Sequence, residues 1–574
     1  MMEVVDGEYQ SLKAHDGAYV RKHFFGKYPE LARLVANMSD DEIWRLTRGG
    51  HDPYKVYNAY LSAVQHKGQP TVILAKTIKG YGMGEAGEGQ NITHQQKKMG
   101  ENALKQFRDR FQIPISDEVI GETPFYRPAE DSPELQYLKS RREALGGYLP
   151  VRHAEVPALN VPELSAFQAL LQSSEERQLS TTMAFVRVLT ALTRDKDIGK
   201  LIVPIVPDES RTFGMEGMFR SLGIYSSVGQ LYEPQDHDQL MYYREDVNGQ
   251  ILQEGINEAG AFSSWIAAAT AYSSHSVTTI PFYIFYSMFG FQRIGDLAWA
   301  AGDMRCRGFL MGGTAGRTTL NGEGLQHQDG HSQVHASFIP NCVSYDPTFA
   351  YEVAVIIQDG LRRMYRDHEN VFYYITVMNE NYNHPAMPEG VQEGILKGMY
   401  LYRNGAKAGR PTVQLLGSGT ILREAIAAAE LLEQDWGVSS NVWSAPSFNE
   451  LARDGQATAR WNRHHPEEAP RKSYVAQCLE PTTGPVIAAT DYIKTFTEQI
   501  RAFVPRRYVT LGTDGFGRSD TRAKLRHFFE VDRHYITLAA LNALVAEGTL
   551  PASRAAEAIR KYGLDPEKPL PSSV

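Results

Sequence analysis

The sequence predicts an α/β protein with several doubly wound, mainly parallel sheets. Short apolar runs of strand length alternate with helical segments through most of the 574 residues, and this order places helices on both faces of a parallel sheet. Several of these runs end in glycine-rich or polar turns, where the ligands of doubly wound folds collect. At roughly one domain per 150 residues, a chain of this length forms three or four units.

The composition is that of a globular protein without nucleic-acid or membrane partners. Hydrophobic residues make up 42% of the chain, charged residues 22%, and the net charge is -8, which disfavours binding to a nucleic-acid polyanion. No apolar run reaches the roughly 18 residues of a membrane helix, and the first residues lack the pattern of a secretory signal. Cys306, Cys342 and Cys478 have unrelated spacings, which argues against disulfides and a cysteine zinc site. We therefore expect a soluble protein of the reducing cytoplasm.

The first domain is expected to span residues 1–155. Residues 70–75 form an apolar run that predicts a buried strand, and this run continues into a glycine-rich loop over residues 76–90. The proline-rich, charged stretch over residues 124–157 has little periodicity and predicts a linker. We therefore place the first boundary near residue 155.

The second domain is expected to span residues 156–387. Hydroxyl residues precede a helix predicted over residues 180–192, and a buried strand follows over residues 200–206. Glu258 heads a helix of small residues, and an aromatic strand and turn follow it over residues 280–291. A further helix over 293–301 and a short strand over 308–311 complete the alternation.

The third domain is expected to span residues 388–574. A strand over residues 412–419, a helix over 421–433 and a strand over 440–444 together predict a βαβ unit. Two further strands are expected over residues 485–489 and 508–512.

Glu258 is the first candidate site residue. A lone buried carboxylate costs several kcal/mol unless it is paired, so a glutamate beside an aromatic strand points to a functional role. His327 and His331 share a glycine-rich run with Glu323 and Asp329, and this run fits proton handling or loop ordering better than metal ligation.

Three more residues are candidates with two open interpretations each. His94 follows the glycine-rich loop, so it is either on a segment that closes over substrate or an exposed histidine without a role. Asp208 and Glu209 come directly after the 200–206 strand, where they either line a site or cap a helix.

Six long motifs resemble one family, the thiamine-diphosphate-dependent decarboxylating component of pyruvate dehydrogenase of the homodimeric bacterial type, a relative of transketolase. The resemblance spans essentially the whole chain. It implies sheets of the transketolase-like thiamine-diphosphate-binding type and a transketolase C-terminal-like α/β domain. The motifs occupy residues 77–84 (TIKGYGMG), 208–216 (DESRTFGME), 253–258 (QEGINE), 280–293 (IPFYIFYSMFGFQR), 320–327 (LNGEGLQH) and 511–520 (LGTDGFGRSD).

The resemblance implies that the chain decarboxylates pyruvate with thiamine diphosphate as cofactor. Glu258 would hydrogen-bond the pyrimidine ring of the cofactor and so activate the carbon that attacks pyruvate. Tyr286 and His327 would contact the substrate carboxylate or the intermediate. Asp208 and Glu209 would lie near the cofactor.

The resemblance also implies partners. His94 would assist transfer of the acetyl group to the lipoyl domain of the dihydrolipoyl acetyltransferase, and Glu88 would lie on the same mobile loop. A homodimer is implied, because the cofactor of this family lies between subunits.

The family's Gly-Asp-Gly motif, followed downstream by an Asn, binds diphosphate and magnesium, and it does not occur in the 574 residues. We therefore expect the chain to begin inside the first domain of the family, with the ligands of diphosphate and Mg²⁺ on the missing N-terminal part. No metal ligand is assigned within the chain. The alternatives are a catalytically silent fragment that only docks to partner subunits and a transketolase-like enzyme acting on sugar phosphates.

Overall fold

The computed structural model describes residues 4–46, 49–148, 152–153, 155–207, 210–235, 243–321 and 325–574. The chain divides into two compact units, Met1–Leu149 and Pro150–Val574, and each is described by itself. Among the described residues, no helix combines the length and the apolarity that a membrane crossing requires.

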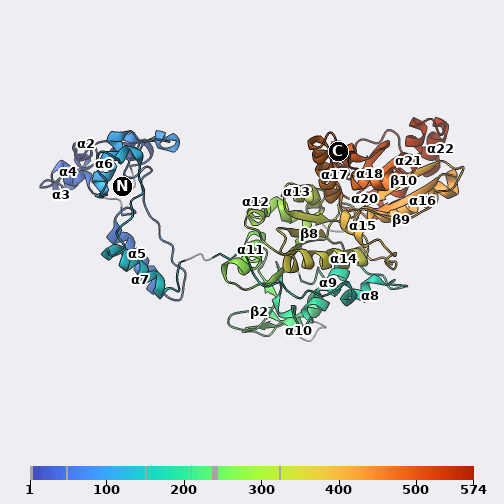
Figure 1. Ribbon diagram of the computed structural model, residues 1–574, viewed down its shortest axis with the longest axis horizontal. Coiled ribbons are helices and arrows are strands. Elements are labelled where there is room, and N and C mark those ends of the chain that lie inside the picture. The colour runs from blue at the N-terminus through green and yellow to red at the C-terminus, as the bar shows by residue number, and fades with distance from the viewer. Residues whose placement is uncertain are drawn as a thin grey trace. The chain divides into compact units, whose positions relative to one another are not determined.

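Unit 1 is helical, and its described residues contain no strand. Polar caps start several of its helices. Ser39 caps α4 and shares a reciprocal capping box with Glu42, and Asp52 caps α5, because the first amides of a helix need an acceptor. The helices, shown in blue in Figure 1, are α1 (Asp6–Ala14), α2 (Gly17–His23), α3 (Pro29–Leu34), α4 (Asp40–Trp44), α5 (Pro53–Gln65), α6 (Glu101–Phe111) and α7 (Pro133–Ala144), with short turns η1 (Phe25–Lys27), η2 (Gly84–Ala86), η3 (Asn91–Gln95) and η4 (Ile120–Glu122).

The strand predicted over residues 70–75 is wrong. This segment has no regular secondary structure, and the side chains of Val72 and Leu74 are 81% and 91% exposed. A strand needs a neighbour that pairs with its backbone amides and carbonyls, and the described residues of unit 1 supply none. An apolar run alone therefore did not make a strand here.

The linker predicted over residues 124–157 is also partly wrong, because it contains helix α7. Ser132 caps this helix by accepting a hydrogen bond from the Leu135 amide at 3.3 Å, and Pro133 occupies the first helical turn. Proline is favoured at that position, where its missing N–H is not needed.

Unit 2 contains a six-stranded sheet in which every pair is parallel. Its strand order, β4-β1-β5-β6-β8-β7, places the aromatic strand β5 near the centre. The strands are β1 (Ile202–Val206), β4 (Leu252–Gln253), β5 (Ile280–Tyr286), β6 (Phe309–Gly313), β7 (Cys342–Tyr345) and β8 (Phe372–Thr376).

Helices cover this sheet, and α14 is buried along its whole length of 12 residues. Ser180 caps α9 as its sequence predicts. Helix α12 packs against α11, and α9 packs against α14 (Figure 1). The helices and turns of this part are η5 (Leu164–Phe167), α8 (Gln168–Leu171), α9 (Thr181–Thr193), η6 (Gly199–Leu201), η7 (Glu216–Met218), α10 (Phe219–Leu222), α11 (Glu258–Ser274), η8 (Ser287–Phe289), α12 (Gly290–Asp303), η9 (Leu325–His327), α13 (Ser332–Ser337), α14 (Ala350–Leu361) and the π-helical turn η10 (Arg362–Arg366).

A second sheet of unit 2 has the order β13-β12-β10-β11-β9, in which β9 is antiparallel to its neighbour. A small parallel pair, β2 (Ile224–Tyr225) and β3 (Glu245–Asp246), is separate from both sheets. The strands of the second sheet are β9 (Tyr400–Arg403), β10 (Thr412–Gly417), β11 (Ser439–Ser444), β12 (Val486–Ala489) and β13 (Tyr508–Leu511). Its helices and turns are α15 (Gln392–Lys397), α16 (Ile421–Trp436), α17 (Phe448–His464), α18 (Tyr474–Leu479), α19 (Thr495–Glu498), η11 (Arg501–Phe503), α20 (Arg522–Phe528), α21 (Arg533–Ala546), α22 (Ala552–Tyr562) and η12 (Pro571–Ser573).

The α/β fold class and the strands and helices predicted for residues 180–512 are confirmed. The carboxyl ends of the parallel strands are the positions where doubly wound folds place their ligands. Tyr286 is the last residue of β5 and Gly313 the last residue of β6, so the loops that follow these two neighbouring strands meet at one edge of the sheet.

Candidate functional site

Glu258 is the first residue of α11 and is only 9% exposed. The side chain of Asn257 caps the helix by accepting a hydrogen bond from the Gly260 amide at 3.0 Å. A carboxylate in the first turn also gains from the positive end of the helix dipole. The local sequence therefore fixes a largely buried acid at the start of a helix.

Arg293 of α12 is the partner of this acid. Its Nη1 donates to Glu258 Oε1 at 2.7 Å, and no other side-chain hydrogen bond to the Glu258 carboxylate is present among the residues that the structure describes. The same guanidinium lies 4.2 Å from the centre of the Phe289 ring, a distance typical of a cation–π contact. Arg293 thus connects the acid to an aromatic surface and leaves Glu258 Oε2 open.

Tyr283 of β5 is within electrostatic range of Glu258. Its hydroxyl is buried and has no hydrogen-bond partner in the described part of the chain. Burial and, after it, the negative charge of Glu258 raise the pKa of Tyr283 above its ordinary value. The phenol therefore stays neutral and keeps its O–H donor.

Tyr286, Phe289 and His327 form an aromatic group that we call the aromatic wall. The ring centres of Tyr286 and His327 are 5.2 Å apart, those of Phe289 and His327 5.1 Å, and those of Tyr286 and Phe289 5.8 Å. The Tyr286 hydroxyl also lies 3.5 Å from Thr212 Oγ1. Edge-to-face and tilted packing at these distances stabilises the three rings as a unit.

The structure thus connects three of the predicted site residues, Glu258, Tyr286 and His327, through Arg293 and Phe289. No role of Arg293 or Phe289 is predicted from the sequence. Their spacing was the available signal, because residues four apart at the start of a helix share one face.

Asp208 and Glu209 lie outside the described residues. Strand β1, which precedes them, ends at Val206 within the six-stranded sheet. Their roles therefore remain a prediction.

Asp329, in the same glycine-rich run as His331 and Glu323, orders the loop that contains it. Asp329 Oδ1 accepts hydrogen bonds from the amides of His331 and Ser332, both at 2.9 Å. His331 Nδ1 lies 4.0 Å from the same oxygen, and Glu323 is outside the described residues. Within the described ranges, no group of three or more histidine, cysteine, aspartate or glutamate side chains is placed to hold a metal ion.

The remaining predicted residues lie in unit 1. His94, in η3, has Nδ1 3.2 Å from Lys79 Nζ. Glu88 is 3% exposed and binds Arg110 Nη1 at 2.5 Å and Lys13 Nζ at 3.3 Å. Burial works to raise the pKa of Glu88, but Arg110 and Lys13 outweigh it and hold the pKa below its ordinary value. Glu88 is therefore an ionised anchor of this loop.

Two family profiles match the chain. The profile described as "Pyruvate dehydrogenase E1 component middle domain" matches residues 155–385, and "Transketolase-like TK C-terminal domain" matches residues 398–532. A protein of Cupriavidus necator named "Pyruvate dehydrogenase E1 component" is 65% identical over 100% of this chain and 64% of its own length. The chain is therefore similar, over its whole length, to pyruvate dehydrogenase E1 components.

Other pyruvate dehydrogenase E1 components match in the same way. Those of Pseudomonas aeruginosa and Escherichia coli K12 are 64% and 57% identical over 99% of this chain. In each case the matched region is 64% of the relative, so this chain spans less than two thirds of the length of these relatives.

Solved structures support the fold of this chain. The transketolase of Campylobacter jejuni has a TM-score of 0.58 at 18% identity, and the match covers 86% of this chain and 66% of the transketolase chain. The transketolase of Leishmania mexicana has a TM-score of 0.57 at 16% identity, with coverages of 91% and 67%. At such identities the likeness concerns the fold alone, and it confirms the predicted transketolase-like class.

Proposed function

We propose that this chain is the part of a pyruvate dehydrogenase E1 enzyme that activates thiamine diphosphate, decarboxylates pyruvate and passes the acetyl group to a lipoyl group. The observation that carries the proposal is Glu258 itself. It is a nearly buried acid at a helix start, with one oxygen on Arg293 and the other open beside aromatic rings, in a chain 65% identical to an E1 component.

The donor set around Glu258 fits the pyrimidine end of the cofactor. The open Oε2 is an acceptor for a ring N–H, and an adjacent aromatic wall suits a flat heterocycle. The diphosphate end requires cations or a metal bridge. We propose that the ligands of diphosphate and Mg²⁺ belong to the part of the relatives that this chain does not match.

Bound thiamine diphosphate supplies a nucleophilic carbon and an electron sink for decarboxylation. The chain's own residues bind the cofactor and the substrate and hold or move protons. Glu258 holds a ring proton on Oε2, while Arg293 keeps the carboxylate oriented. Tyr286 and His327 donate hydrogen bonds to the substrate carboxylate or oxygen, and their ring contacts fix both donors in place. Asp208 and Glu209, at the end of β1, are proposed to line the same site.

His94 is proposed to serve the transfer of the acetyl group to the lipoyl domain of the acetyltransferase, and Glu88 to anchor the loop that carries His94. A homodimer in the cytoplasm completes the proposal. Transketolase chemistry is the weaker candidate, because the chain is 65% identical to an E1 component and 18% identical to a transketolase of the same fold.

Calorimetric titration tests the proposal. Thiamine diphosphate with Mg²⁺ is titrated into the chain mixed with a polypeptide that supplies the unmatched third of an E1 relative. Glu258→Gln should weaken binding about 10-fold or more, equivalent to about 1.4 kcal/mol, and should abolish carbon dioxide release from pyruvate. The matched control is Glu393→Gln, because Glu393 is an exposed residue of α15. Equal binding and turnover by the Glu258 and Glu393 variants would reject the role of Glu258.

A further inference from the structure

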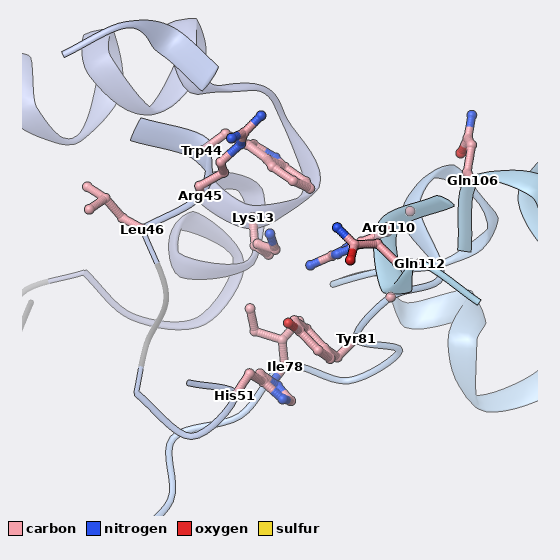
Figure 2. Close-up of a pocket in the computed structure, with 12 residues that line it drawn as sticks. Lys13, Trp44, Arg45, Leu46, His51, Ile78, Tyr81, Gln106, Arg110 and Gln112 are labelled. Atoms are coloured by element: carbon pink, nitrogen blue, oxygen red, sulfur yellow. The ribbon is translucent and has the colours of Figure 1, made fainter. Parts of the chain in front are cut away.

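Unit 1 has a pocket of about 630 Å³ whose charged and aromatic side chains contact one another (Figure 2). Lys13 Nζ lies 3.9 Å from the centre of the Trp44 ring, and the Arg110 guanidinium lies 4.7 Å from the centre of the Tyr81 ring. Both cations also bind Glu88. These contacts stabilise the walls of the pocket, and no ligand follows from them.

The segment over residues 511–520 in unit 2 carries the last of the six motifs, but the proposed function gives it no role. It begins at the last residue of β13, an edge strand of the second sheet. Thr513 anchors it, because the Thr513 amide donates to the carbonyl of Tyr492 and the Thr513 hydroxyl to the carbonyl of Asp491, both at 2.8 Å. The segment is therefore fixed beyond the carboxyl end of β12, the strand that pairs with β13.

Gly517 of this segment lies directly against η9, the turn that contains His327. A Cβ atom at Gly517 would lie 2.6 Å from the carbonyl oxygen of Leu325 and 2.9 Å from Gln328 Oε1. Both distances are well below the roughly 3.5 Å of a nonbonded carbon contact. Glycine permits this close approach of two backbones, and a larger residue would displace the turn.

Gln328, the residue after His327, joins the turn to the same segment. Its side chain is buried, at 1% exposure. Its Nε2 donates to the carbonyl of Leu320 at 2.9 Å, and its Oε1 accepts a hydrogen bond from the Arg518 amide at 2.7 Å. A buried amide whose donor and acceptor are both paired holds one orientation. Gln328 therefore connects the loop of His327 to residues 511–520.

The loop that carries His327 has a second attachment to the end of β12. The amide and the hydroxyl of Thr318 both donate to Asp491 Oδ1, at 2.9 Å and 2.6 Å. On the other side of the turn, the Ile493 amide donates to the carbonyl of Gly330 at 2.7 Å. The backbone around His327 is thus held by the second sheet, while the His327 ring packs on the aromatic wall beside the first sheet.

We propose that Gln328 and Gly517 are positioning residues that set the place of the His327 ring for decarboxylation. The assignment rests on the proposed function, in which His327 contacts the substrate carboxylate or the intermediate. A donor in a catalytic site must be held to within about 0.5 Å, and a displacement of about 1 Å can cost 100-fold in rate. The segment over residues 511–520 acts on the reaction through the turn, without touching the substrate itself.

A double-mutant cycle tests whether Gln328 acts through His327. Carbon dioxide release is measured on the chain mixed with a polypeptide that supplies the unmatched third of an E1 relative. Gln328→Met keeps the length of the side chain without its amide and should lower kcat about 10-fold or more. Thiamine diphosphate affinity should stay unchanged, because Glu258 keeps its contact with Arg293. In a His327→Ala background, Gln328→Met should lower kcat by less than about 2-fold further.

Two measurements on the full chain alone need no activity. Gln328→Met should speed hydrogen exchange of the Arg518 amide about 3- to 10-fold, the effect of one lost hydrogen bond. Gly517→Ala should shift the ring signal of His327 in NMR spectra of the histidine-labelled chain. The signal of His384, a histidine of the same unit with 2% exposure, should stay in place and shows that the variant is folded.

Two substitutions of the same kinds serve as matched controls. Gln168→Met changes an exposed glutamine of α8, and Gly295→Ala changes a glycine of α12 where an added Cβ meets open space. Neither should alter kcat, the Arg518 exchange or the His327 signal.

The outcomes separate this proposal from the proposed function. Faster Arg518 exchange and a shifted His327 signal, with no carbon dioxide release by the wild-type mixture, would reject the proposed function and still support Gln328 and Gly517 as the residues that position His327. Unchanged Arg518 exchange in Gln328→Met, or an unchanged His327 signal in Gly517→Ala, overturns the proposal. An equal kcat loss from Gln328→Met with and without His327 also overturns it.

Discussion

Arg293 Nη1 donates to Glu258 Oε1 at 2.7 Å across the contact between α12 and α11. The two side chains differ in exposure, with 49% for Arg293 and 11% for Glu258. The carboxylate loses more hydration on folding than the guanidinium does. The hydrogen bond therefore stabilises the buried Glu258 more than it stabilises the exposed Arg293.

This asymmetry predicts the effect of substitutions at Arg293. Arg293→Met leaves a mostly buried carboxylate without its hydrogen-bond donor and should lower the free energy of unfolding by about 1–3 kcal/mol. Arg293→Lys keeps the charge and should cost less, because only the planar contact with Phe289 is lost. Urea denaturation measures both values. Equal losses for the two variants would show that the charge on Arg293 does not stabilise Glu258.

The contact between Lys79 and His94 predicts a proton arrangement. A charged lysine only donates hydrogen bonds, so His94 Nδ1, 3.2 Å from Lys79 Nζ, is the acceptor, and Nε2 carries the proton of the neutral ring. That N–H is free to serve a substrate.

His94→Ala should therefore reduce acetylation of a lipoyl domain more than carbon dioxide release from pyruvate, by about 10-fold or more if one proton-transfer step is lost. Both rates are measured on the same mixture of the chain and its complementing polypeptide. His66→Ala, at an exposed histidine that ends α5, is the control. An equal loss in the two assays would remove His94 from the transfer step.

Asp346 predicts a pH dependence of unit 2. It is fully buried after β7 and accepts hydrogen bonds from Thr376 and Ser418, each at 2.8 Å. The pKa of Asp346 is raised from 3.8 to about 7. Burial is the main cause and the charges of Asp491 and Asp329 add to it, while the two hydroxyl donors act in the opposite direction. The folded chain thus holds a proton that the unfolded chain releases near pH 4.

Stability linked to Asp346 should therefore fall as the pH rises from about 4 to about 7 and level off above that, with an upper limit of about 4 kcal/mol. Asp346→Asn, which stays neutral, should flatten this decline in urea denaturation curves recorded across the interval. Asp303→Asn, at an exposed position at the end of α12, should leave the decline unchanged. A wild-type stability that rises over this interval, with the same slope in Asp346→Asn, would contradict the assignment.

Local sequence patterns predicted correctly the elements that depend on short-range interactions. The apolar runs of β1 and β5 form strands because they pair with neighbouring strands of the six-stranded sheet. Residues 70–75 are also apolar, but the described residues of unit 1 provide no strand that pairs with them. Helix α7 was missed because the prolines of the surrounding stretch suggested a linker, although a serine cap and a first-turn proline were both present. The pairing of Glu258 with Arg293 joins residues 35 positions apart. Such a contact depends on how two helices pack, which no local pattern specifies.

The exposed segment over residues 70–75 predicts that an apolar substitution there is nearly neutral. Leu74 is 91% exposed, whereas Leu12 of α1, in the same unit, is 7% exposed. Leu74→Ala should change the free energy of unfolding by less than about 0.5 kcal/mol. Leu12→Ala should cost about 2–5 kcal/mol through lost burial and the cavity left behind. Denaturant titration of both variants provides the comparison.

Leu74→Lys adds a second readout from the same surface. An extended, exposed apolar segment with unpaired backbone groups favours association between chains, and a lysine opposes such pairing. Light scattering of concentrated Leu74→Lys should therefore show less self-association than that of the wild type, with an unchanged unfolding curve. Lys55→Leu on α5, an exposed residue of the same unit, tests the opposite change and should increase association. A Leu74→Ala loss as large as that of Leu12→Ala would mean that Leu74 is covered in solution.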